Sequence, residues 1–174
     1  MSLPYIEENF ISSDECQRLI DFADANKKEN VSRDDVYSTE IEWIDHGATY
    51  YGNNVDPVTA ESDDDAVIKV TEKCKTFAEC ELIYAGVVRW PVGTFMKPHF
   101  DKNDVHGEDV FAAMLYLNDD FEGGSTVFEH MEVKPETGKL IVFSNSKYLH
   151  YVTRVDKSER YVLSFWYKYP KSNE

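Results

Sequence analysis

The second half of the chain is divided into short runs of β-branched and aromatic residues, separated by turn residues. Such runs are typical of β-strands, and little of the sequence between them has a helical period. Sequential strands at this spacing favour antiparallel sheets arranged as a sandwich or a jelly roll, whose mouth can hold a ligand. The six predicted strands are LIYAGVVRW (82–90), FAAMLYL (111–117), STVFEH (125–130), KLIVFS (139–144), HYVTRV (150–155) and RYVLSFWYKY (160–169).

The first half of the chain has the apolar spacing of two amphipathic helices. The first begins after Ser12, because Glu15 stands three residues later and the pair forms a capping box. The second covers residues 61–81, and the aspartates after Ser62 suit the positive end of a helix dipole. A calcium site is the weaker interpretation of these aspartates, since the spaced pattern of a calcium loop is absent. The apolar stripes are Cys16, Leu19, Ile20 and Ala23, then Ala66, Val70, Cys74 and Phe77.

Between the helices, residues 31–52 alternate in a way that predicts one more strand, closed by a turn at Gly52, Asn53 and Asn54. The fold class is therefore mainly β with flanking helices, which pack on the outside of one sheet. At 174 residues the chain fits one domain, residues 1–174. Within it we expect a helical N-terminal support over residues 1–81 and a jelly-roll core over residues 82–170.

The charge of the chain limits its partners. It has 33 acidic and 18 basic residues and a formal net charge of -15. This balance disfavours nucleic acids and anionic membranes, and it favours a neutral or basic partner. It would also repel a small dianion, so an acidic cosubstrate would need a local cation to hold it.

The three cysteines, Cys16, Cys74 and Cys80, lack the spacing of metal ligands. The N-terminal sequence MSLPYIEENF has no apolar core of signal-peptide length, so we expect reduced thiols and a cytoplasmic protein, from a bacterium or a virus-infected cell. No run reaches the length of about 20 apolar residues that a membrane-spanning helix needs.

The stretch KPHFDKNDVHG, residues 97–107, contains the most informative polar residues. His99 and Asp101 are two residues apart on an extended segment, so both side chains project to the same side and can reach one metal ion. His150, after the apolar run 139–144, is a candidate third ligand. Two imidazoles and one carboxylate with open positions opposite suit Fe(II) oxygen chemistry better than a closed zinc site. Taken without His150, a hydrogen-bonded surface pair remains an alternative for His99 and Asp101.

Arg160 stands ten residues after His150 and opens an aromatic-rich run. Its guanidinium can grip a carboxylate with two hydrogen bonds, which makes it the local cation that an acidic cosubstrate would need. Ser164, four residues later, projects to the same side of a regular strand and adds a hydroxyl donor.

The motifs HFD, YLNDDFEGGSTVF, LHYVTRV and ERYVLSFWY resemble the Fe(II)/2-oxoglutarate-dependent oxygenases, and among them the prolyl 4-hydroxylase-like family. The resemblance covers residues 88–166, and the opening FISSDECQRLIDFA is also similar. It implies a double-stranded β-helix, that is, a cupin-like jelly roll. It further implies that His99, Asp101 and His150 hold iron and that Arg160 pairs with the distal carboxylate of 2-oxoglutarate.

The resemblance implies roles for other residues as well. Tyr116 matches a tyrosine whose hydroxyl helps to hold the cosubstrate carboxylate, and Ser164 matches a Thr or Ser with the same role. Trp166 matches an aromatic residue that lines the pocket, and Met114 is expected to face that pocket. Trp90 stands where many relatives have tyrosine, so an indole replaces a phenol there.

The activity that the resemblance implies is the hydroxylation of a prolyl residue in a peptide or protein, with decarboxylation of 2-oxoglutarate to succinate and CO2. Its requirements would be Fe(II), 2-oxoglutarate and O2, with ascorbate as a candidate reductant. One alternative is a hydroxylase of a free amino acid or small metabolite, and another is a jelly-roll protein that binds metal without turnover. The loops at 53–65 and 102–110, which would decide the substrate, carry no recognisable code. Monomer and homodimer both remain open.

Three further features have simpler interpretations. We expect His106 to lie on a loop, residues 102–107, that closes over the substrate, and His130 to lie at a turn, neither as a metal ligand. The run NDDFEGGST, residues 118–126, is both a turn and a marker of the family. Arg154 and Arg160 form a pair seen in nucleic-acid demethylating oxygenases, but its distance from His150 does not suit that branch.

Overall fold

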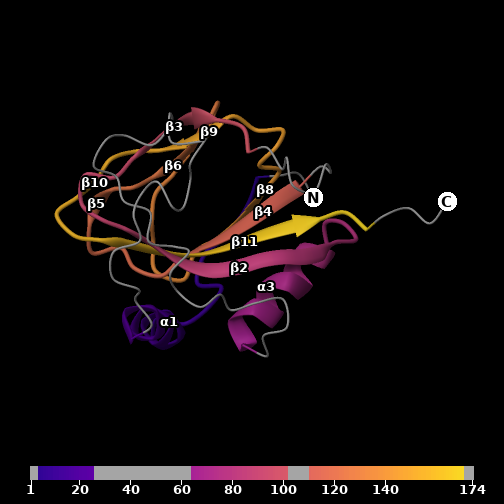
Figure 1. Cartoon of the computed structure of the whole chain (residues 1–174), viewed down its shortest axis with the longest axis horizontal. Coiled ribbons are helices and arrows are strands. Elements are labelled where there is room, and N and C mark those ends of the chain that lie inside the picture. Colours follow the sequence, from indigo (N-terminus) through magenta and orange to yellow (C-terminus); the bar gives the residue numbers. More distant parts are fainter. Residues whose placement is uncertain (1–3, 26–63, 102–109, 171–174) are drawn as a thin grey trace.

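The computed structural model describes residues 4–25, 64–101 and 110–170, and it consists mainly of β-strands with two helices (Figure 1). The elements are β1 (Tyr5–Glu7), α1 (Ser13–Ala25), α3 (Asp65–Lys75), β2 (Glu81–Trp90), β3 (Met96–His99), β4 (Val110–Tyr116), β5 (Glu122–Gly123), β6 (Thr126–Phe128), β7 (Met131–Val133), β8 (Leu140–Phe143), β9 (His150–Val152), β10 (Val155–Asp156) and β11 (Arg160–Lys168).

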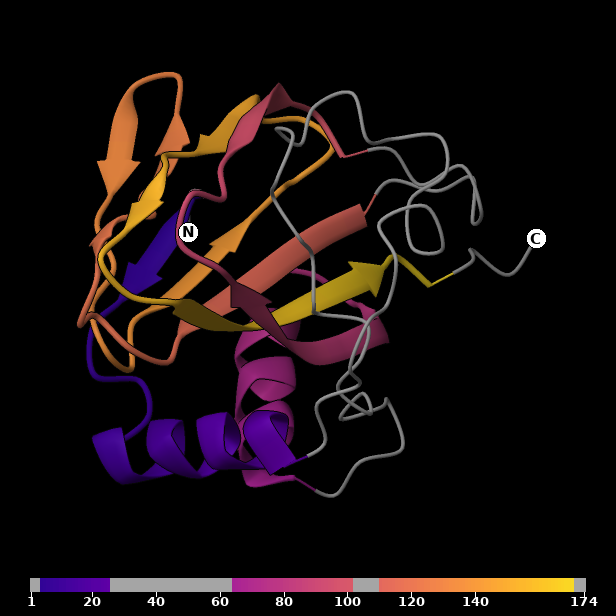
Figure 2. The ribbon, with the colours of Figure 1, turned by 60° about the vertical axis from the view of Figure 1, so that its left-hand side comes forward.

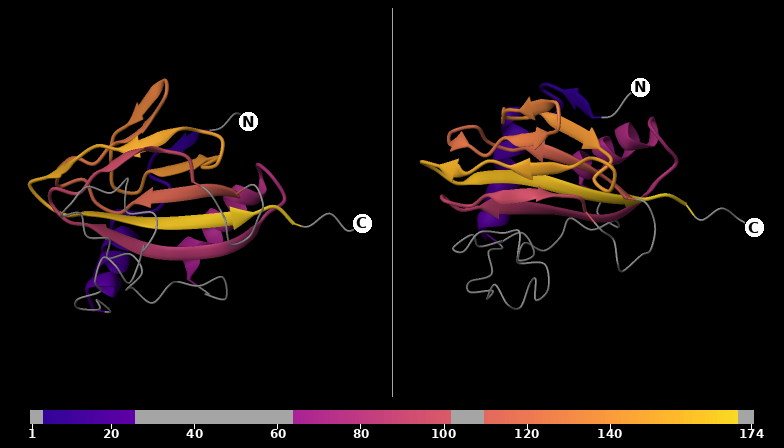
Figure 3. Two further views of the ribbon diagram at one scale, coloured as in Figure 1. Left: turned by 45° about the horizontal axis from the view of Figure 1, so that its top comes forward. Right: turned by 90° about the horizontal axis from the view of Figure 1, so that it is seen from above.

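Two antiparallel sheets face each other as a jelly roll (Figures 1 and 3). The major sheet has the order β1-β8-β4-β11-β2, with the long strand β11 paired to β4 on one side and β2 on the other. The minor sheet has the order β3-β9-β6-β7, and a short β10-β5 ladder lies beside it. The crossovers between the sheets bring together strands that are distant in sequence, including β3 and β9.

Alternate residues of the major sheet belong to two different apolar cores. On β11, Tyr161, Leu163 and Phe165 pack into the core that includes residues of both helices. Val162 and Trp166 lie in the second core, which is formed between the sheets. Since side chains alternate along a strand, the even-numbered residues of β11 all face the space between the sheets. Both helices lie on the opposite side of the major sheet (Figure 2).

The predicted start of the first helix is confirmed. The Ser12 hydroxyl accepts a hydrogen bond from the backbone N–H of Glu15, at 3.2 Å, and the Glu15 carboxylate accepts one from the Ser12 N–H, at 3.0 Å. This reciprocal capping box satisfies two donors at the helix N-terminus. Cys16, Leu19 and Ala23 are buried, as their spacing indicates.

The second helix is shorter than the predicted range 61–81. Its N-cap is Asp64, whose carboxylate accepts a hydrogen bond from the Ala66 N–H, and it ends at Lys75. The hydroxyl of the C-cap residue Thr76 donates a hydrogen bond to the carbonyl oxygen of Lys73, in the last turn of the helix. Strand β2 then begins at Glu81. The residues after Thr76 therefore form a turn into the sheet and not a continuation of the helix.

Each of the six predicted strand runs coincides with a strand, and the run 150–155 covers β9 and the first residue of β10. The strand β1 was not predicted; it pairs with β8 and extends the major sheet. The short strands β3, β5 and β7 were also not predicted. The predicted strand at 31–52, His106, and nearly all of the 53–65 and 102–110 loops lie outside the described residues.

All three cysteines are unpaired and buried. Burial raises the pKa of the Cys16 and Cys80 thiols to about 11 and that of Cys74 to about 12. Thiols in such surroundings stay protonated and unreactive. Neither α1 nor α3 is long and apolar enough to cross a membrane.

Candidate metal centre

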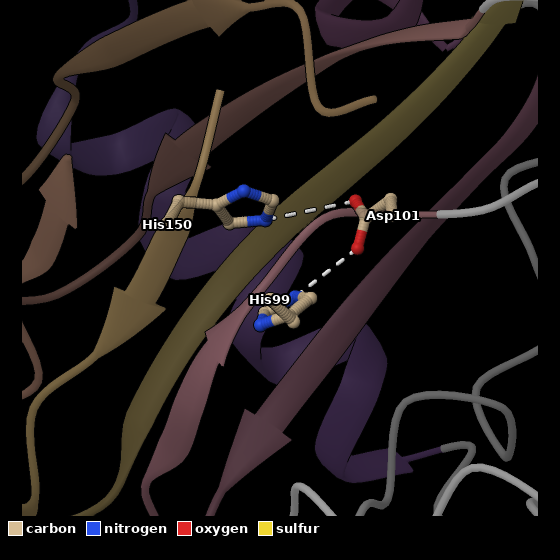
Figure 4. Close-up of side chains that lie close together, drawn as sticks. All are labelled: His99, Asp101 and His150. Atoms are coloured by element: carbon tan, nitrogen blue, oxygen red, sulfur yellow. Dashed lines mark ion pairs between the residues drawn. The ribbon is translucent and has the colours of Figure 1, made fainter. Parts of the chain in front are cut away.

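His99, Asp101 and His150 meet at one end of the space between the sheets (Figure 4). His99 ends β3 and His150 begins β9, and the antiparallel register places these two residues directly opposite each other. Their ring centroids are 4.3 Å apart. Asp101 follows His99 by two residues and turns its carboxylate toward both imidazoles. The pairing of β3 with β9 thus assembles three side chains that the sequence singles out.

The three side chains are close enough to share one metal ion. Asp101 Oδ1 lies 3.1 Å from His99 Nε2, and Asp101 Oδ2 lies 3.7 Å from His150 Nε2. Metal bonds of about 2.1 Å that meet at right angles separate their two donor atoms by about 3 Å. Among the described residues, this is the only group of His, Cys, Asp and Glu side chains with such spacing.

Backbone carbonyls fix the orientation of both imidazoles. His99 Nδ1 lies 2.7 Å from the Lys97 carbonyl oxygen, and His150 Nδ1 lies 2.8 Å from the Tyr148 carbonyl oxygen. A carbonyl oxygen only accepts hydrogen bonds, so in each neutral ring the proton resides on Nδ1 and Nε2 keeps its lone pair. Both lone pairs are then available to a cation beside Asp101, which is the arrangement that histidine ligands of metals commonly have.

The surroundings of His150 favour the neutral imidazole. Burial lowers its pKa, against the opposing effect of the Asp101 carboxylate, and His99 lowers it further. The rings of Phe143 and Phe128 pack against His150, with centroid distances of 5.0 and 6.2 Å. These contacts make one wall of the site apolar, and only neutral histidine can ligate a metal.

Asn145, in the turn after β8, makes two bonds to Asp101 that the sequence did not reveal. The Asn145 carbonyl oxygen accepts a hydrogen bond from the Asp101 N–H at 2.9 Å, and its side-chain amide donates to Asp101 Oδ2, also at 2.9 Å. Asn145 is fully buried. The motif FSNSKYLH gives no local signal for this role, because the contact joins residues 44 positions apart.

Arg160 lies at the start of β11, with its side chain between the sheets and fully buried. Its guanidinium carbon is 4.6 Å from the centroid of the Trp90 ring and 5.3 Å from that of Tyr116. One of its nitrogens, Nη2, lies 3.5 Å from the sulfur of Met114. Aromatic faces and a thioether thus surround the guanidinium of Arg160. A buried positive charge of this kind could bind an anion within a chain of strong negative net charge.

The other predicted cosubstrate residues lie on this same face of the major sheet. Ser164 is paired with Met114 of β4 and with Gly86 of β2, and it is half-buried. Trp166 is also half-buried and packs against the core between the sheets. The alternation of side chains along β11 therefore aligns Arg160, Ser164 and Trp166.

The Tyr116 hydroxyl, which the resemblance assigns to the cosubstrate carboxylate, bonds to the minor sheet in this structure. It lies 2.7 Å from the Thr126 hydroxyl and 3.3 Å from the Val133 carbonyl oxygen, and so links β4 to the minor sheet. Its ring, in contrast, lies against Arg160. Thr126 belongs to the GGST block, and no local pattern indicates its contact with Tyr116.

Gly124 of the GGST block leaves space for Arg160. Its φ is +63°, and a Cβ atom built on it would lie 2.9 Å from Arg160 Cδ and 2.8 Å from Phe121 Cε2. Such distances are too short for a real contact, so only glycine allows Arg160 to occupy its present position. The NDDFEGGST run, predicted as a turn, instead contains β5 and the first residue of β6, and Gly124 between them packs against the predicted anion-binding residue.

His130 lies where it was predicted, at the turn between β6 and β7. Its side chain is 87% exposed, and its nearest charged partner is Glu129, at 3.7 Å. It is not part of the cluster formed by His99, Asp101 and His150.

Comparison with known proteins agrees with this arrangement. Residues 85–168 match the family model of the 2OG-Fe(II) oxygenase superfamily. The human protein prolyl 3-hydroxylase 2 is 37% identical over 65 residues, which represent 33% of this chain and only 9% of that protein.

Two solved structures have a similar fold. One is the viral collagen prolyl hydroxylase of Paramecium Bursaria Chlorella virus-1, in a 2OG complex, with a TM-score of 0.67, 19% identity and coverage of 97% of both chains. The other is a Pseudomonas putida prolyl-4-hydroxylase, with a TM-score of 0.67, 19% identity and coverage of 95% of this chain and 92% of that one.

Proposed function

We propose that this chain, whose residues 85–168 match the 2OG-Fe(II) oxygenase superfamily, is a dioxygenase of that superfamily that hydroxylates a prolyl residue in a peptide or protein. The observation that carries the proposal is the convergence of His99, Asp101 and His150, with ligand atoms within 4.8 Å of one another. Arg160, on the facing sheet, supplies the cation that an acidic cosubstrate requires.

The donor set fits Fe(II). Two neutral imidazoles and one carboxylate leave positions for a chelating cosubstrate and for oxygen, whereas a structural zinc site would be closed by a fourth protein ligand. Within the described residues, no fourth His, Cys, Asp or Glu joins the group. Bound there, Fe(II) with 2-oxoglutarate and O2 would supply the oxidation, in which the cosubstrate becomes succinate and CO2 and the substrate gains a hydroxyl group.

The side chains of this protein would bind and orient the reactants. The guanidinium of Arg160 would pair with the distal carboxylate of 2-oxoglutarate, and Ser164 would add a hydroxyl from the same face of β11. Phe128, Phe143 and Trp166 would keep water from the reacting groups.

The proposal that the substrate is a prolyl residue is supported by the names of the proteins that this chain resembles. The three similar proteins named above are a prolyl 3-hydroxylase, a prolyl-4-hydroxylase and a collagen prolyl hydroxylase. The net charge of -15 favours a neutral or basic peptide over an acidic one.

The experiment that tests the proposal measures succinate formation with Fe(II), 2-oxoglutarate and O2, with collagen-like proline peptides as substrates. We expect succinate and a peptide mass increase of one oxygen atom, both lost in His99→Ala. Hydroxylation of free proline but of no peptide would favour the small-metabolite alternative. Tight metal binding without 2-oxoglutarate binding would favour the non-catalytic jelly-roll protein.

A further inference from the structure

We propose that Asn145 is a positioning residue, which holds Oδ2 of Asp101 so that the carboxylate presents Oδ1 to the metal. The proposal rests on the metal site of the proposed function, and it does not depend on the substrate. None of the comparisons assigns a role to Asn145, and it stands in a turn five residues before His150.

The two hydrogen bonds between Asn145 and Asp101 hold different parts of Asp101, one its main chain and the other its carboxylate. The Asn145 carbonyl oxygen accepts from the Asp101 N–H, which fixes the main chain just after His99. The side-chain amide donates to Oδ2 at 2.9 Å, while Oδ1 is the oxygen nearer His99, at 3.1 Å from Nε2. An ionised carboxylate can only accept hydrogen bonds, so the group that faces Oδ2 must be the amide nitrogen of Asn145.

Packing alone does not explain an asparagine at this position. Asn145 is fully buried, and its side-chain oxygen has no hydrogen-bond partner among the described residues. A buried polar atom without a partner destabilises the folded state, so an apolar side chain of the same size would suit the interior better. The bond from the amide to Asp101 is the feature that an apolar side chain could not supply.

The hydrogen bond from Asn145 to Oδ2 affects how many oxygens Asp101 offers to a metal. A carboxylate that bound the metal through both oxygens would occupy a position that the chelating cosubstrate or oxygen needs. The amide of Asn145 uses one lone pair of Oδ2 and fixes the orientation of the carboxylate, which leaves Oδ1 as the oxygen better placed for the metal. Hydrogen-bonding partners of metal ligands commonly act in this way, and their loss costs about 10- to 100-fold in metal affinity or activity.

The test compares the parent protein with Asn145→Leu, which removes the amide and leaves the main-chain bond to Asp101. We expect Co(II) affinity, measured without cosubstrate, to fall about 10- to 100-fold. The Co(II) absorption spectrum should change as Asp101 becomes free to use both oxygens. The metal-free variant loses a hydrogen bond to a carboxylate, so its unfolding temperature should fall, as we expect for a purely structural asparagine as well. The loss of Co(II) affinity and the change of spectrum are the results that a purely structural role of Asn145 would not give.

Asn118→Leu is the matched control. Its amide also bonds a carboxylate, that of Asp120 at 2.7 Å, and its side-chain oxygen accepts from the Tyr161 N–H. We expect a loss of thermal stability and unchanged Co(II) affinity and spectrum. Co(II) affinity of Asn145→Leu within threefold of the parent value would overturn the proposal, and a parent that binds no Co(II) would overturn the metal site as well.

A crystal structure of the metal-loaded parent gives a second test, which does not depend on how the variants fold. We expect the Asn145 amide on Oδ2 of Asp101 and the metal on Oδ1. Both oxygens of Asp101 on the metal, or an Asn145 amide turned away from it, would overturn the proposal.

Discussion

The guanidinium carbon of Arg160 lies over the indole ring of Trp90, 4.6 Å from its centroid. The two residues are direct partners in the antiparallel register of β11 and β2. An aromatic face attracts a cation most strongly where water is excluded, and here Arg160 is fully buried and Trp90 is 5% exposed. Trp90 therefore holds in place the group that we expect to grip 2-oxoglutarate.

Trp90→Leu should weaken 2-oxoglutarate binding by about 10- to 30-fold, which corresponds to the loss of a desolvated cation–π contact of up to about 2 kcal/mol. Trp90→Phe keeps an aromatic face and should lose less. The measurement is the titration of metal-loaded protein with 2-oxoglutarate. Equal affinities for the two variants would show that stacking on Arg160 does not matter for binding.

Arg160→Lys should lose most of the affinity for 2-oxoglutarate, although the positive charge is retained. A planar guanidinium can form two parallel hydrogen bonds with one carboxylate, and an ammonium group cannot reproduce that geometry. We expect a loss of about 10- to 100-fold, as for hydrogen bonds to charged groups worth about 1.5 to 3 kcal/mol. Metal affinity without cosubstrate is the control and should not change. Unaltered 2-oxoglutarate affinity would remove Arg160 from the site.

Gly124→Ala should displace Arg160, because its new Cβ would lie 2.9 Å from Arg160 Cδ. The positive φ of +63° adds backbone strain, so we expect a loss of about 1 to 3 kcal/mol in unfolding free energy as well as weaker 2-oxoglutarate binding.

Gly138→Ala is the matched control for that variant. Its φ is +82°, and its Cβ would meet the backbone of Ile11 and not Arg160. It should lower stability to a comparable extent, as measured by urea unfolding, and leave 2-oxoglutarate affinity unchanged. If both variants weakened binding equally, the effect of Gly124→Ala would reflect general destabilisation.

The sequence predicted most of this site because the information is local. Alternation along one strand places Arg160 and Ser164 on the same face, and a two-residue spacing does the same for His99 and Asp101. In the structure, Arg160 Nη2 lies 3.5 Å from the sulfur of Met114, the residue paired with Ser164, and His99 and Asp101 belong to one cluster. Local patterns also located the capping box and every long strand of the jelly roll.

What the sequence did not reveal depends on contacts between distant segments. The pairing of Trp90 with Arg160 follows from the register of β2 against β11, which no local pattern specifies. The bonds of Asn145 to Asp101 join the turn after β8 to the end of β3. Similarly, β1 has only three residues and gains its conformation by pairing with β8.

The buried thiols should be protected in the folded protein. Burial raises the pKa of Cys16 and Cys80 to about 11, so at pH 8 only about one thiol in a thousand is ionised at each position. A disulfide reagent should react slowly at pH 8, faster as the pH rises toward the pKa, and rapidly with all cysteines in urea. Fast reaction of the native protein at pH 8 would contradict the burial of these side chains.

His99→Ala and His130→Ala separate the metal ligands from the other histidines. Removal of the His99 imidazole deletes one of three donors to the metal. The affinity for Co(II) or Fe(II) should therefore fall by more than about 100-fold, which is the upper end of the loss expected when only a hydrogen-bonding partner of a ligand is removed. The His130 side chain is 87% exposed at a turn, so His130→Ala should bind metal like the parent. Isothermal titration under anaerobic conditions measures both. Parent-like metal affinity in His99→Ala would mean that Asp101 and His150 do not form the site with His99, and the assignment of the centre would fail.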